Sequence, residues 1–293
     1  MTGVSVVIVA YNGLPWIEQA LASVAGVDTV VVDNGSSDGT VAFVRERFPE
    51  VRILERENRG LAAGWNAGVE HTEGSYVLLL NSDAWLDGGA LDTLVAYADA
   101  HPDVAVVGPR LRNPDGTLQR SVRGFPTLWR LATEYLFLRK LAPRSRLLNA
   151  FYAAGYAHDA EREAEFLMGA VWLVRRAAID EVGPADERFF LFSEEVDWAY
   201  RLRRAGWRSV FLPGAGATHV YGASHKGGLY REIQRGHLRF LAKHRGAADA
   251  ERARRLLRAA LAVRGALYRG ERGRTARETA AWLGSGSVDD LLA

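Results

Sequence analysis

Short segments that contain polar side chains follow three of the apolar runs in the first third of the sequence. They are Ala10-Tyr11-Asn12 after the run from Val4, Asp33-Asn34 after the run from Asp28, and Asn81-Ser82-Asp83 after the run from Tyr76. In open α/β sheets, ligands bind at the carboxyl ends of the strands. We therefore expect these three segments to meet in one crevice.

Two acids at these strand ends could bind different parts of a nucleotide. The Asp33 carboxylate can accept an N–H of a pyrimidine or bind a ribose hydroxyl, and Asp83 offers an oxygen ligand for Mg²⁺ or Mn²⁺. The plainer alternatives are a tight loop with a helix cap at residues 34–39 and an ordinary turn at 81–83. The sequence contains no GxGxxG after the first strand and no GxxxxGK[ST], so a nucleotide would be held in another way.

A second acidic cluster, Glu194, Glu195 and Asp197, opens a predicted helix from Glu194 to Ala205. Acids at a helix N-terminus complement the helix dipole, which explains one or two of them better than three. Aromatic residues on both sides of the cluster could desolvate a carboxylate, raise its pKa and make it a better general base. His219, in a predicted glycine-rich loop, is either structural or a ligand.

The elements that would position these residues follow an α/β rhythm. Strands are expected at 4–10, 28–33, 51–55, 76–81 and 104–108 with helices between them, which predicts a mainly parallel, doubly wound sheet. Residues 113–116 form a predicted hairpin turn, and residues 126–165 a partly helical insertion. Further strands are expected at 166–174 and 208–212, followed by a loop over 214–228 and then helices almost to the end.

Composition narrows the class of protein. With 48% hydrophobic and 25% charged residues in a chain of 293, the sequence is typical of a folded globular protein, and no apolar run is long enough to span a bilayer. The absence of cysteine excludes disulfides and thiolate sites, and it permits a cytoplasmic location.

The net charge of +2 conceals a basic tail. Residues 229–277 hold 14 Lys or Arg and 4 Asp or Glu. A solvated helical bundle and contact with an anionic membrane both explain this tail, and no nucleic-acid partner is expected. We predict two regions, residues 1–225 and a basic helical region at 226–293, with the first divided into halves at 1–110 and 111–225.

Several segments, taken in order, resemble the family-2 inverting glycosyltransferases of the GT-A fold, and more narrowly their bacterial rhamnosyltransferase-like members. The series runs through Val-Ser-Val-Val-Ile-Val-Ala-Tyr-Asn, Val-Val-Asp-Asn-Gly-Ser-Ser-Asp-Gly-Thr, Glu-Asn-Arg-Gly, Gly-Trp-Asn-Ala-Gly, Leu-Leu-Asn-Ser-Asp, Met-Gly-Ala, Asp-Glu-Arg-Phe-Phe, Glu-Glu-Val-Asp-Trp and His219. The resemblance covers residues 4 to about 224, and it is the order of the segments that makes it specific.

The resemblance implies a role for each matched residue. The nucleotide-sugar site would comprise Ala10, Tyr11, Asn12, Asp33, Asn34, Asn58, Gly60, Gly64, Asn66, Asn81, Ser82 and Asp83. Asp83 would be the last acid of the family's DxD metal triplet, in which Asn81 replaces the first Asp, and His219 would complete the metal shell. Glu195 would be the catalytic base, with Glu194 and Asp197 as alternatives, and Gly169, Asp186 and Trp198 would lie near the acceptor.

The implied activity is an inverting, metal-assisted transfer of a sugar from a nucleotide-diphosphate donor to a glycan or lipid-linked glycan, in the synthesis of cell-wall or surface polysaccharide. The first choice of donor is deoxythymidine diphosphate rhamnose, and Mg²⁺ or Mn²⁺ is the expected cofactor. The implied location is the cytoplasm, at the inner face of the membrane if the tail binds lipid. Two alternatives stay open: a catalytically silent nucleotide-sugar-binding protein, and a nucleotidyltransferase.

Overall fold

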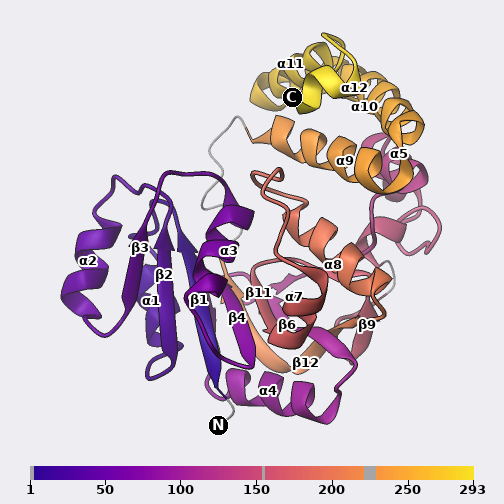
Figure 1. Ribbon diagram of the computed structural model, residues 1–293. Helices are drawn as coiled ribbons and strands as arrows, with labels where there is room; N and C mark the ends of the chain where they lie inside the picture. Colours follow the sequence, from indigo (N-terminus) through magenta and orange to yellow (C-terminus); the bar gives the residue numbers. More distant parts are fainter. Residues whose placement is uncertain (1–2, 154–155, 221–228) are drawn as a thin grey trace.

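The computed structural model describes residues 3–153, 156–220 and 229–293 (Figure 1). Its elements are β1 (Val4–Ala10), α1 (Ile17–Ala22), β2 (Asp28–Asp33), α2 (Thr40–Arg47), β3 (Arg52–Glu55), α3 (Leu61–Glu70), β4 (Tyr76–Asn81), β5 (Ala84–Leu86), α4 (Ala90–Ala100), β6 (Val104–Arg112), β7 (Leu118–Gln119), β8 (Val122–Arg123), α5 (Leu128–Tyr135), α6 (Leu138–Leu141), η1 (Ala150–Tyr152), β9 (Arg162–Ala164), β10 (Phe166–Leu167), β11 (Val171–Arg175), α7 (Arg176–Val182), α8 (Glu194–Arg204), β12 (Arg208–His219), α9 (Tyr230–Arg245), α10 (Ala247–Leu267), α11 (Gly270–Leu283) and α12 (Val288–Leu292).

The central sheet has the order β3-β2-β1-β4-β11-β6-β12-β5. Strands β1 to β4 pair in parallel, and β6 pairs in parallel with β12, while β11 lies antiparallel between the two groups. The expected mainly parallel α/β sheet is therefore confirmed. The central strands read as nearly continuous apolar runs because both faces of the sheet are covered.

Each face of the sheet packs against its own set of helices. One buried cluster joins side chains of α1, α2 and α4 to the strands, and the other joins α3, α7, α8 and the C-terminal helices to the opposite face. On this second face, Trp65 of α3 stacks on Trp172 and Trp198, with ring centroids 6.2 and 6.1 Å apart. This aromatic stack fixes α8, which carries the acidic cluster, against α3 and the sheet.

Two predicted elements differ in the structure. The strand expected at 166–174 is broken into β10 and β11 by Met168-Gly169-Ala170, because β10 pairs with β8 whereas β11 pairs with β4 and β6. The strand expected at 208–212 continues to His219, since its second half pairs with β5 and β6. His219 therefore lies at the end of a strand and not in a loop, and the rest of the expected loop, residues 221–228, is outside the described residues.

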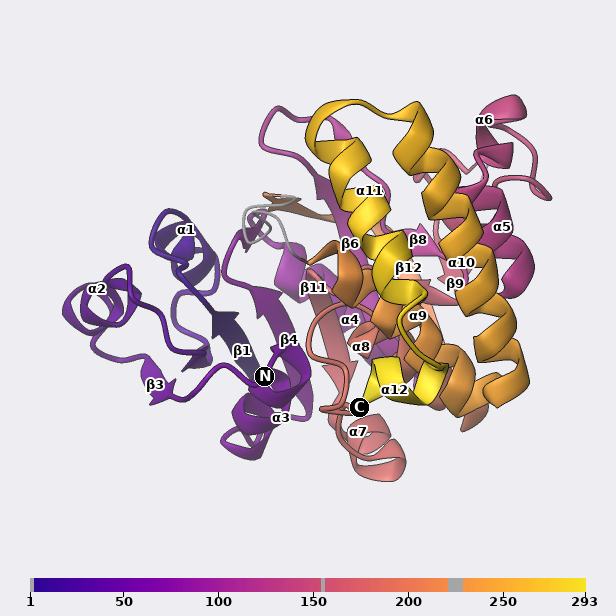
Figure 2. The same cartoon turned by 90° about the horizontal axis from the view of Figure 1, so that it is seen from above.

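The C-terminal helices lie over the end of the molecule opposite α4, and α10 runs beside α5 (Figures 1 and 2). Helix α9 buries Leu238, Phe240 and Leu241 in the same core as α8. The tail is thus packed onto the α/β body, although the boundary predicted at 225–226 lies outside the described residues. Within the described ranges, no helix combines the length and apolarity needed to cross a membrane.

Candidate active site

A cavity of about 450 Å³ opens at the carboxyl ends of β1 and β4 and extends between the start of α8, α5, η1 and the C-terminal helices. Many of the predicted site residues line it, although they come from segments far apart in the sequence. These residues are Tyr11, Asn34, Asn58, Gly60, Asn81, Ser82, Asp83, Gly169, Glu194, Glu195 and His219.

Asp83 and His219 meet at one wall of this cavity. Asp83 Oδ1 lies 3.4 Å from His219 Nε2, and both residues are buried. Their approach follows from strand pairing: Ala84 of β5 is the partner of His219 in β12, and Val220 N donates to Asp83 O at 2.9 Å. The β5–β12 ladder thus joins a turn near residue 83 to a strand that ends more than a hundred residues later.

Gln119 of β7, which the sequence did not single out, orients His219. Its Nε2 donates to Asn113 Oδ1 at 2.8 Å and to His219 O at 3.3 Å, so its Oε1 accepts from His219 Nδ1 at 2.7 Å. With the proton on Nδ1, the lone pair of Nε2 is directed toward Asp83. The hairpin turn predicted at 113–116 is present and holds Gln119 in place, since β7 pairs with β6.

This pair has the chemistry of a divalent-metal site. Two ligands about 2.1 Å from one ion and at right angles to each other are about 3 Å apart, close to the observed separation. A histidine whose other nitrogen is held by a hydrogen bond is the usual arrangement at metal sites. Within the described residues, no group of three or more His, Cys, Asp or Glu gathers in this way, so the pair could supply only part of a coordination shell.

Other lining residues lie at the ends of β1 and β2 and just before α3. The Tyr11 side chain is 49% exposed, whereas Asn34 is buried and donates from Nδ2 to Gly60 O at 3.1 Å. Asn58 Oδ1 accepts from Gly60 N at 3.1 Å. Gly60 has a φ of 95°, and a β-carbon there would lie 2.2 Å from Phe190 O. Only glycine therefore fits where the backbone at residue 60 passes the segment before α8.

Asp33 is buried at the end of β2, just before the cavity residue Asn34, and does not itself line the cavity. Its Oδ2 accepts from Gly35 N at 3.0 Å and from Ser36 N at 2.9 Å, which fixes the following loop. Its Oδ1 is buried without a hydrogen-bond partner. An unpaired buried carboxylate oxygen is costly, and a ligand N–H or O–H would satisfy it.

Besides Asp33, four residues expected to touch the nucleotide do not line the cavity, and each has structural contacts. Ala10 is fully buried in β1, and Asn12 Oδ1 accepts from Ser37 N at 2.9 Å. A β-carbon on Gly64 would lie 2.6 Å from Val9 Cγ1, so this glycine allows α3 to approach β1. Asn66 exchanges hydrogen bonds with the backbone of Ala185 at 2.9 Å and thereby holds the segment before α8.

Glu194 and Glu195 both line the cavity, and each has one carboxylate oxygen, Oε2, that is buried without a partner. Burial raises the pKa of Glu194 well above its usual range, and the charge of Glu195 raises it further. Burial also raises the pKa of Glu195, while backbone N–H groups and the Arg123 guanidinium act in the opposite direction. Burial therefore favours the protonated form of both carboxyl groups, whereas the Arg123 guanidinium and the backbone N–H groups favour ionisation of Glu195.

The turn before these carboxylates is strained. Phe192 and Ser193 have φ values of 65° and 70°, in the left-handed region that non-glycine residues rarely adopt. Such residues cost about 1–3 kcal/mol each and persist only where their surroundings hold them. Here the turn orients the first residues of α8 toward the cavity.

Asp197, the third acid of the cluster, has a different environment. Its side chain is fully buried, ion-paired with Arg201 at 3.0 Å and Lys243 at 2.8 Å, and hydrogen-bonded to His244 at 2.7 Å. Burial opposes its ionisation, but hydrogen bonds from His244 and Lys243 hold its pKa below the usual range. Asp197 does not line the cavity, and it joins α8 to α9.

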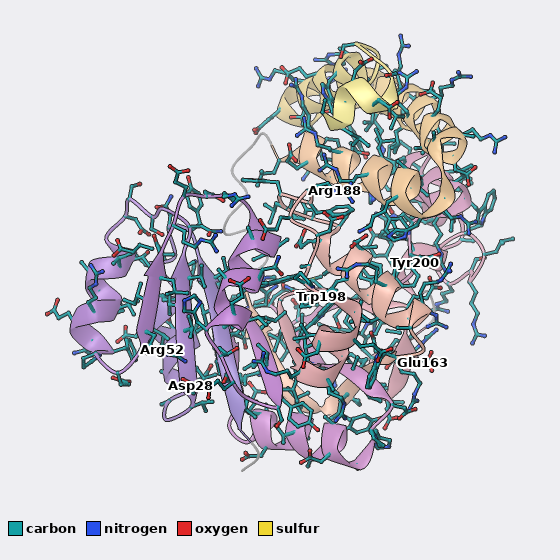
Figure 3. All side chains as sticks on the ribbon, in the orientation of Figure 1. Asp28, Arg52, Glu163, Arg188, Trp198 and Tyr200 are labelled. Atoms are coloured by element: carbon teal, nitrogen blue, oxygen red, sulfur yellow. The ribbon has the colours of Figure 1, made fainter. Side chains whose placement is uncertain are left out.

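Of the three residues expected near the acceptor, one lines the cavity and two do not. Gly169 lines the cavity, and a β-carbon there would lie 3.2 Å from Glu195 Cβ. Trp198 of α8 is 1% exposed in the interior, where Nε1 donates to Gly183 O at 3.0 Å (Figure 3), a placement that does not fit acceptor contact. Asp186 is paired with Arg188 at 2.6 Å and Lys243 at 2.7 Å, outside the cavity lining.

The far part of the cavity, here called the aromatic lobe, was missed by sequence reasoning. Its wall combines side chains of the insertion, β8, β10 and the C-terminal helices, namely Arg123, Leu131, Glu134, Tyr135, Phe151, Tyr152, Phe166, Leu229, Tyr230, Ile233, His237 and Arg264. No local motif marks these residues, because they meet only when α9 and α10 pack beside α5.

Comparison with known proteins identifies relatives of this arrangement. Residues 5–183 match Glycosyl transferase family 2. The chain is 33% identical over 234 residues to the N-acetylglucosaminyl-diphospho-decaprenol L-rhamnosyltransferase of Mycobacterium tuberculosis, covering 73% of this chain and 75% of that protein.

Solved structures share the fold at low sequence identity. The chain resembles GalNAc-T7 with UDP, GalNAc and Mn²⁺ at a TM-score of 0.62 and 13% identity, over 100% of this chain and only 56% of that one. It also resembles the Pyrobaculum calidifontis mannosyltransferase PcManGT in complex with GDP-Man and Mn²⁺, at a TM-score of 0.57 and 20% identity, over 99% and 78% of the two chains. The fold is therefore that of the GT-A glycosyltransferases.

Proposed function

The chain belongs to glycosyl transferase family 2, and on this premise we propose that it transfers a sugar, with inversion, from a nucleotide-diphosphate donor to a lipid-linked glycan. One observation carries the proposal: the Asp83–His219 pair and the Glu195 carboxylate line the same cavity. A single displacement needs a site for the leaving diphosphate and a base for the acceptor hydroxyl.

In this proposal Asn34, Asn58 and the unpaired Oδ1 of Asp33 hold the base and ribose, and Tyr11 covers them. Asp83 and His219 would hold a divalent metal. When bound, Mg²⁺ or Mn²⁺ neutralises the charge that builds up on the diphosphate.

Glu195 is the proposed base. It takes the proton of the acceptor hydroxyl as that oxygen attacks the anomeric carbon, and the diphosphate leaves from the opposite face. Burial and the neighbouring charge raise the pKa of its partner Glu194, which disfavours a second negative charge beside the base. Gly169 leaves the space beside Glu195 that an acceptor needs.

The proposed donor is deoxythymidine diphosphate rhamnose, and the proposed acceptor carries a sugar on a diphospho-lipid. Both follow from the mycobacterial relative, whose name specifies an L-rhamnosyltransferase acting on N-acetylglucosaminyl-diphospho-decaprenol. The aromatic lobe supports the acceptor proposal, because aromatic side chains suit the apolar faces of sugars and lipids. Synthesis of cell-wall or surface polysaccharide is the corresponding proposed role.

A lipid-linked acceptor requires access to a membrane, and one surface suits that contact. Of the nine large hydrophobic side chains exposed among the described residues, six lie in the 128–148 segment or in the second half of α10. We call these six residues the apolar patch, because α5 contacts both α6 and α10 and Trp129 Nε1 donates to Leu147 O; they are Trp129, Leu136, Leu141, Leu147, Val263 and Leu267. Arg144, Arg146, Arg269 and Arg272 are exposed close by in the sequence.

The elements that carry the patch also line the aromatic lobe. Leu131 and Tyr135 of α5 and Arg264 of α10 face the cavity, while other residues of the same two elements belong to the patch. Apolar side chains with surrounding arginines are typical of peripheral binding to anionic lipid. We therefore propose that the protein acts at the inner face of the membrane, with the acceptor entering along α5 and α10.

The proposal is tested by measuring nucleotide-diphosphate release and sugar transfer with a panel of nucleotide sugars and a short-chain diphospho-lipid acceptor. We expect deoxythymidine diphosphate rhamnose to be preferred, and both Asp83→Ala and Glu195→Gln to lose turnover. Donor binding without transfer to any acceptor would contradict the proposal and favour a catalytically silent binding protein.

A further inference from the structure

Arg123 is the one charged side chain of the aromatic lobe that lacks a polar partner among the described residues. It lies at the end of β8, opposite Phe166 of β10, and it is half-buried in the cavity wall. Its guanidinium stacks on the Tyr152 ring, with Cζ 4.9 Å from the centroid. It forms no ion pair with any carboxylate that the structure describes.

The other cationic candidates of the lobe are already engaged or neutral. Arg264 donates to the carbonyl oxygens of Glu134 at 2.5 Å and Tyr135 at 2.9 Å, and it stacks on the rings of Tyr135 and Phe137. Burial lowers the pKa of His237 to about 4, so that imidazole is uncharged at neutral pH. An anion entering the described part of the lobe would therefore find its cation at Arg123.

The position of Arg123 relative to the base limits what that anion can be. Arg123 is near enough to Glu195 for its charge to favour the ionised carboxylate. Its strand pairs with β10, which is followed directly by Met168 and Gly169 against Glu195. The anion site is thus next to the base, on the side of the insertion and the C-terminal helices.

We propose that Arg123 binds a phosphate of the acceptor, so that a sugar attached to that phosphate presents its hydroxyl to Glu195. This rests on the proposed function, in which the acceptor is a diphospho-lipid-linked sugar. A guanidinium stacked on an aromatic ring is already oriented, and its free N–H groups match phosphate oxygens in pairs. The donor's own diphosphate is the other source of the same chemistry, and the experiment separates the two.

The experiment compares two acceptors that differ only in charge. One is N-acetylglucosamine joined through diphosphate to a short isoprenoid, and the other is a neutral alkyl glycoside of the same sugar. Binding of each is measured by titration calorimetry with the donor's nucleotide diphosphate present, and transfer is measured separately. The wild type should bind the diphosphate acceptor more tightly than the neutral one. Arg123→Gln should lower the ratio of these two affinities by roughly 10- to 100-fold, the range expected for a charge-assisted hydrogen bond.

Control variants make the result specific to the Arg123 guanidinium. Arg120→Gln removes an equal charge from an exposed neighbour outside the cavity and should leave the preference intact. Arg123→Lys keeps the charge without the paired N–H groups and should restore part of the preference. The KM for the donor should stay unchanged in all three variants.

The outcomes separate this inference from the proposed function. Equal loss of affinity for both acceptors, a wild type without preference, or a raised donor KM in Arg123→Gln would overturn the role of Arg123. If binding shows the preference and its loss in Arg123→Gln but no sugar is transferred, the phosphate site stands and the transferase proposal fails. If transfer occurs and Arg123→Gln keeps the preference, the transferase stands and the phosphate site fails.

Discussion

Gly236 of α9 packs directly on Ser193, the residue before the two cavity glutamates. A β-carbon at Gly236 would lie 2.6 Å from Ser193 Oγ and 2.9 Å from Phe192 O, so a larger residue would displace the turn. This contact lies at the strained left-handed pair, where the surroundings must hold the backbone. The C-terminal helices therefore support the geometry of Glu194 and Glu195 in addition to lining the cavity.

Gly236→Ala is expected to shift the 192–193 turn and to lower turnover, with a loss of about 1–3 kcal/mol in the free energy of unfolding. Turnover should be measured well below the new melting temperature, so that unfolding does not account for the loss. Gly88→Ala is the matched control, since nothing lies within 4 Å of its added carbon. Unchanged turnover in a folded Gly236→Ala protein would show that the contact does not position the glutamates.

Gln119→Leu is expected to weaken metal binding by about 10- to 100-fold, because it removes the partner that fixes the His219 ring. Binding of Mn²⁺ with nucleotide diphosphate, followed by electron paramagnetic resonance, measures this directly, and activity against metal concentration should shift in parallel. Gln19→Leu, at an exposed position of α1, is the control. Equal Mn²⁺ affinity in wild type and Gln119→Leu would remove Gln119 from the metal site.

The two glutamates are expected to respond differently to neutralisation. Glu195→Gln should lose about 10²- to 10⁴-fold in turnover, whereas Glu194→Gln, which mimics a protonated neighbour, should retain most of it. The kcat/KM of the wild type should fall toward acidic pH with a midpoint above 4.5, because Glu195 must be ionised and burial raises its pKa. A Glu194→Gln protein as inactive as Glu195→Gln would contradict this assignment.

The same pair predicts a pH-dependent stability difference. A raised folded-state pKa means that the folded protein holds the Glu194 proton more tightly than the unfolded chain does, so this contribution is present below the unfolded pKa and is lost as pH rises. Glu194→Gln has no carboxyl proton to lose, so its stability does not fall with rising pH for this reason. Its melting temperature relative to wild type should therefore be higher at about pH 8 than at about pH 4, and an equal difference at both would refute the burial argument.

Asp197→Asn is expected to reduce stability by about 3–5 kcal/mol, because Lys243 and Arg201 would lose their buried carboxylate partner. Chemical denaturation measures the loss. Below the unfolding transition, the pH profile of kcat/KM should match the wild type, since Asp197 lies outside the cavity. If the acidic limb of that profile shifts in Asp197→Asn, Asp197 would again be a candidate for the catalytic base.

Membrane contact is better tested by point substitutions than by removal of the tail, because Leu238, Phe240 and Leu241 of α9 belong to the main core. The triple change Leu141→Ser, Leu147→Ser and Leu267→Ser should weaken co-sedimentation with vesicles containing anionic phosphatidylglycerol. Leu14→Ser, exposed near the nucleotide side, should have no effect. Equal co-sedimentation of all variants would exclude the apolar patch as the contact surface.

The sequence by itself determined the parallel strands and the positions of their polar ends. Apolar runs buried on both faces and ending in Asp33 or Asp83 are local patterns, and parallel strands bring such ends to one edge. The order of motifs also determined the family. It identified His219 as a candidate site residue, although the strand that carries His219 was not predicted. That strand is held by pairing with β5 and β6, which no local pattern encodes.

Only the tertiary structure decided which of the neighbouring residues face the cavity. Glu194, Glu195, Asp197 and Trp198 lie within one and a half helical turns, and the partners that separate them come from distant elements: Lys243 and His244 for Asp197, and Trp65 for Trp198. Gln119 reaches His219 across 100 residues, and the aromatic lobe forms where α5, α9 and α10 converge. Spacing along a helix gives each side chain a direction, but what lies in that direction depends on packing between elements remote in sequence.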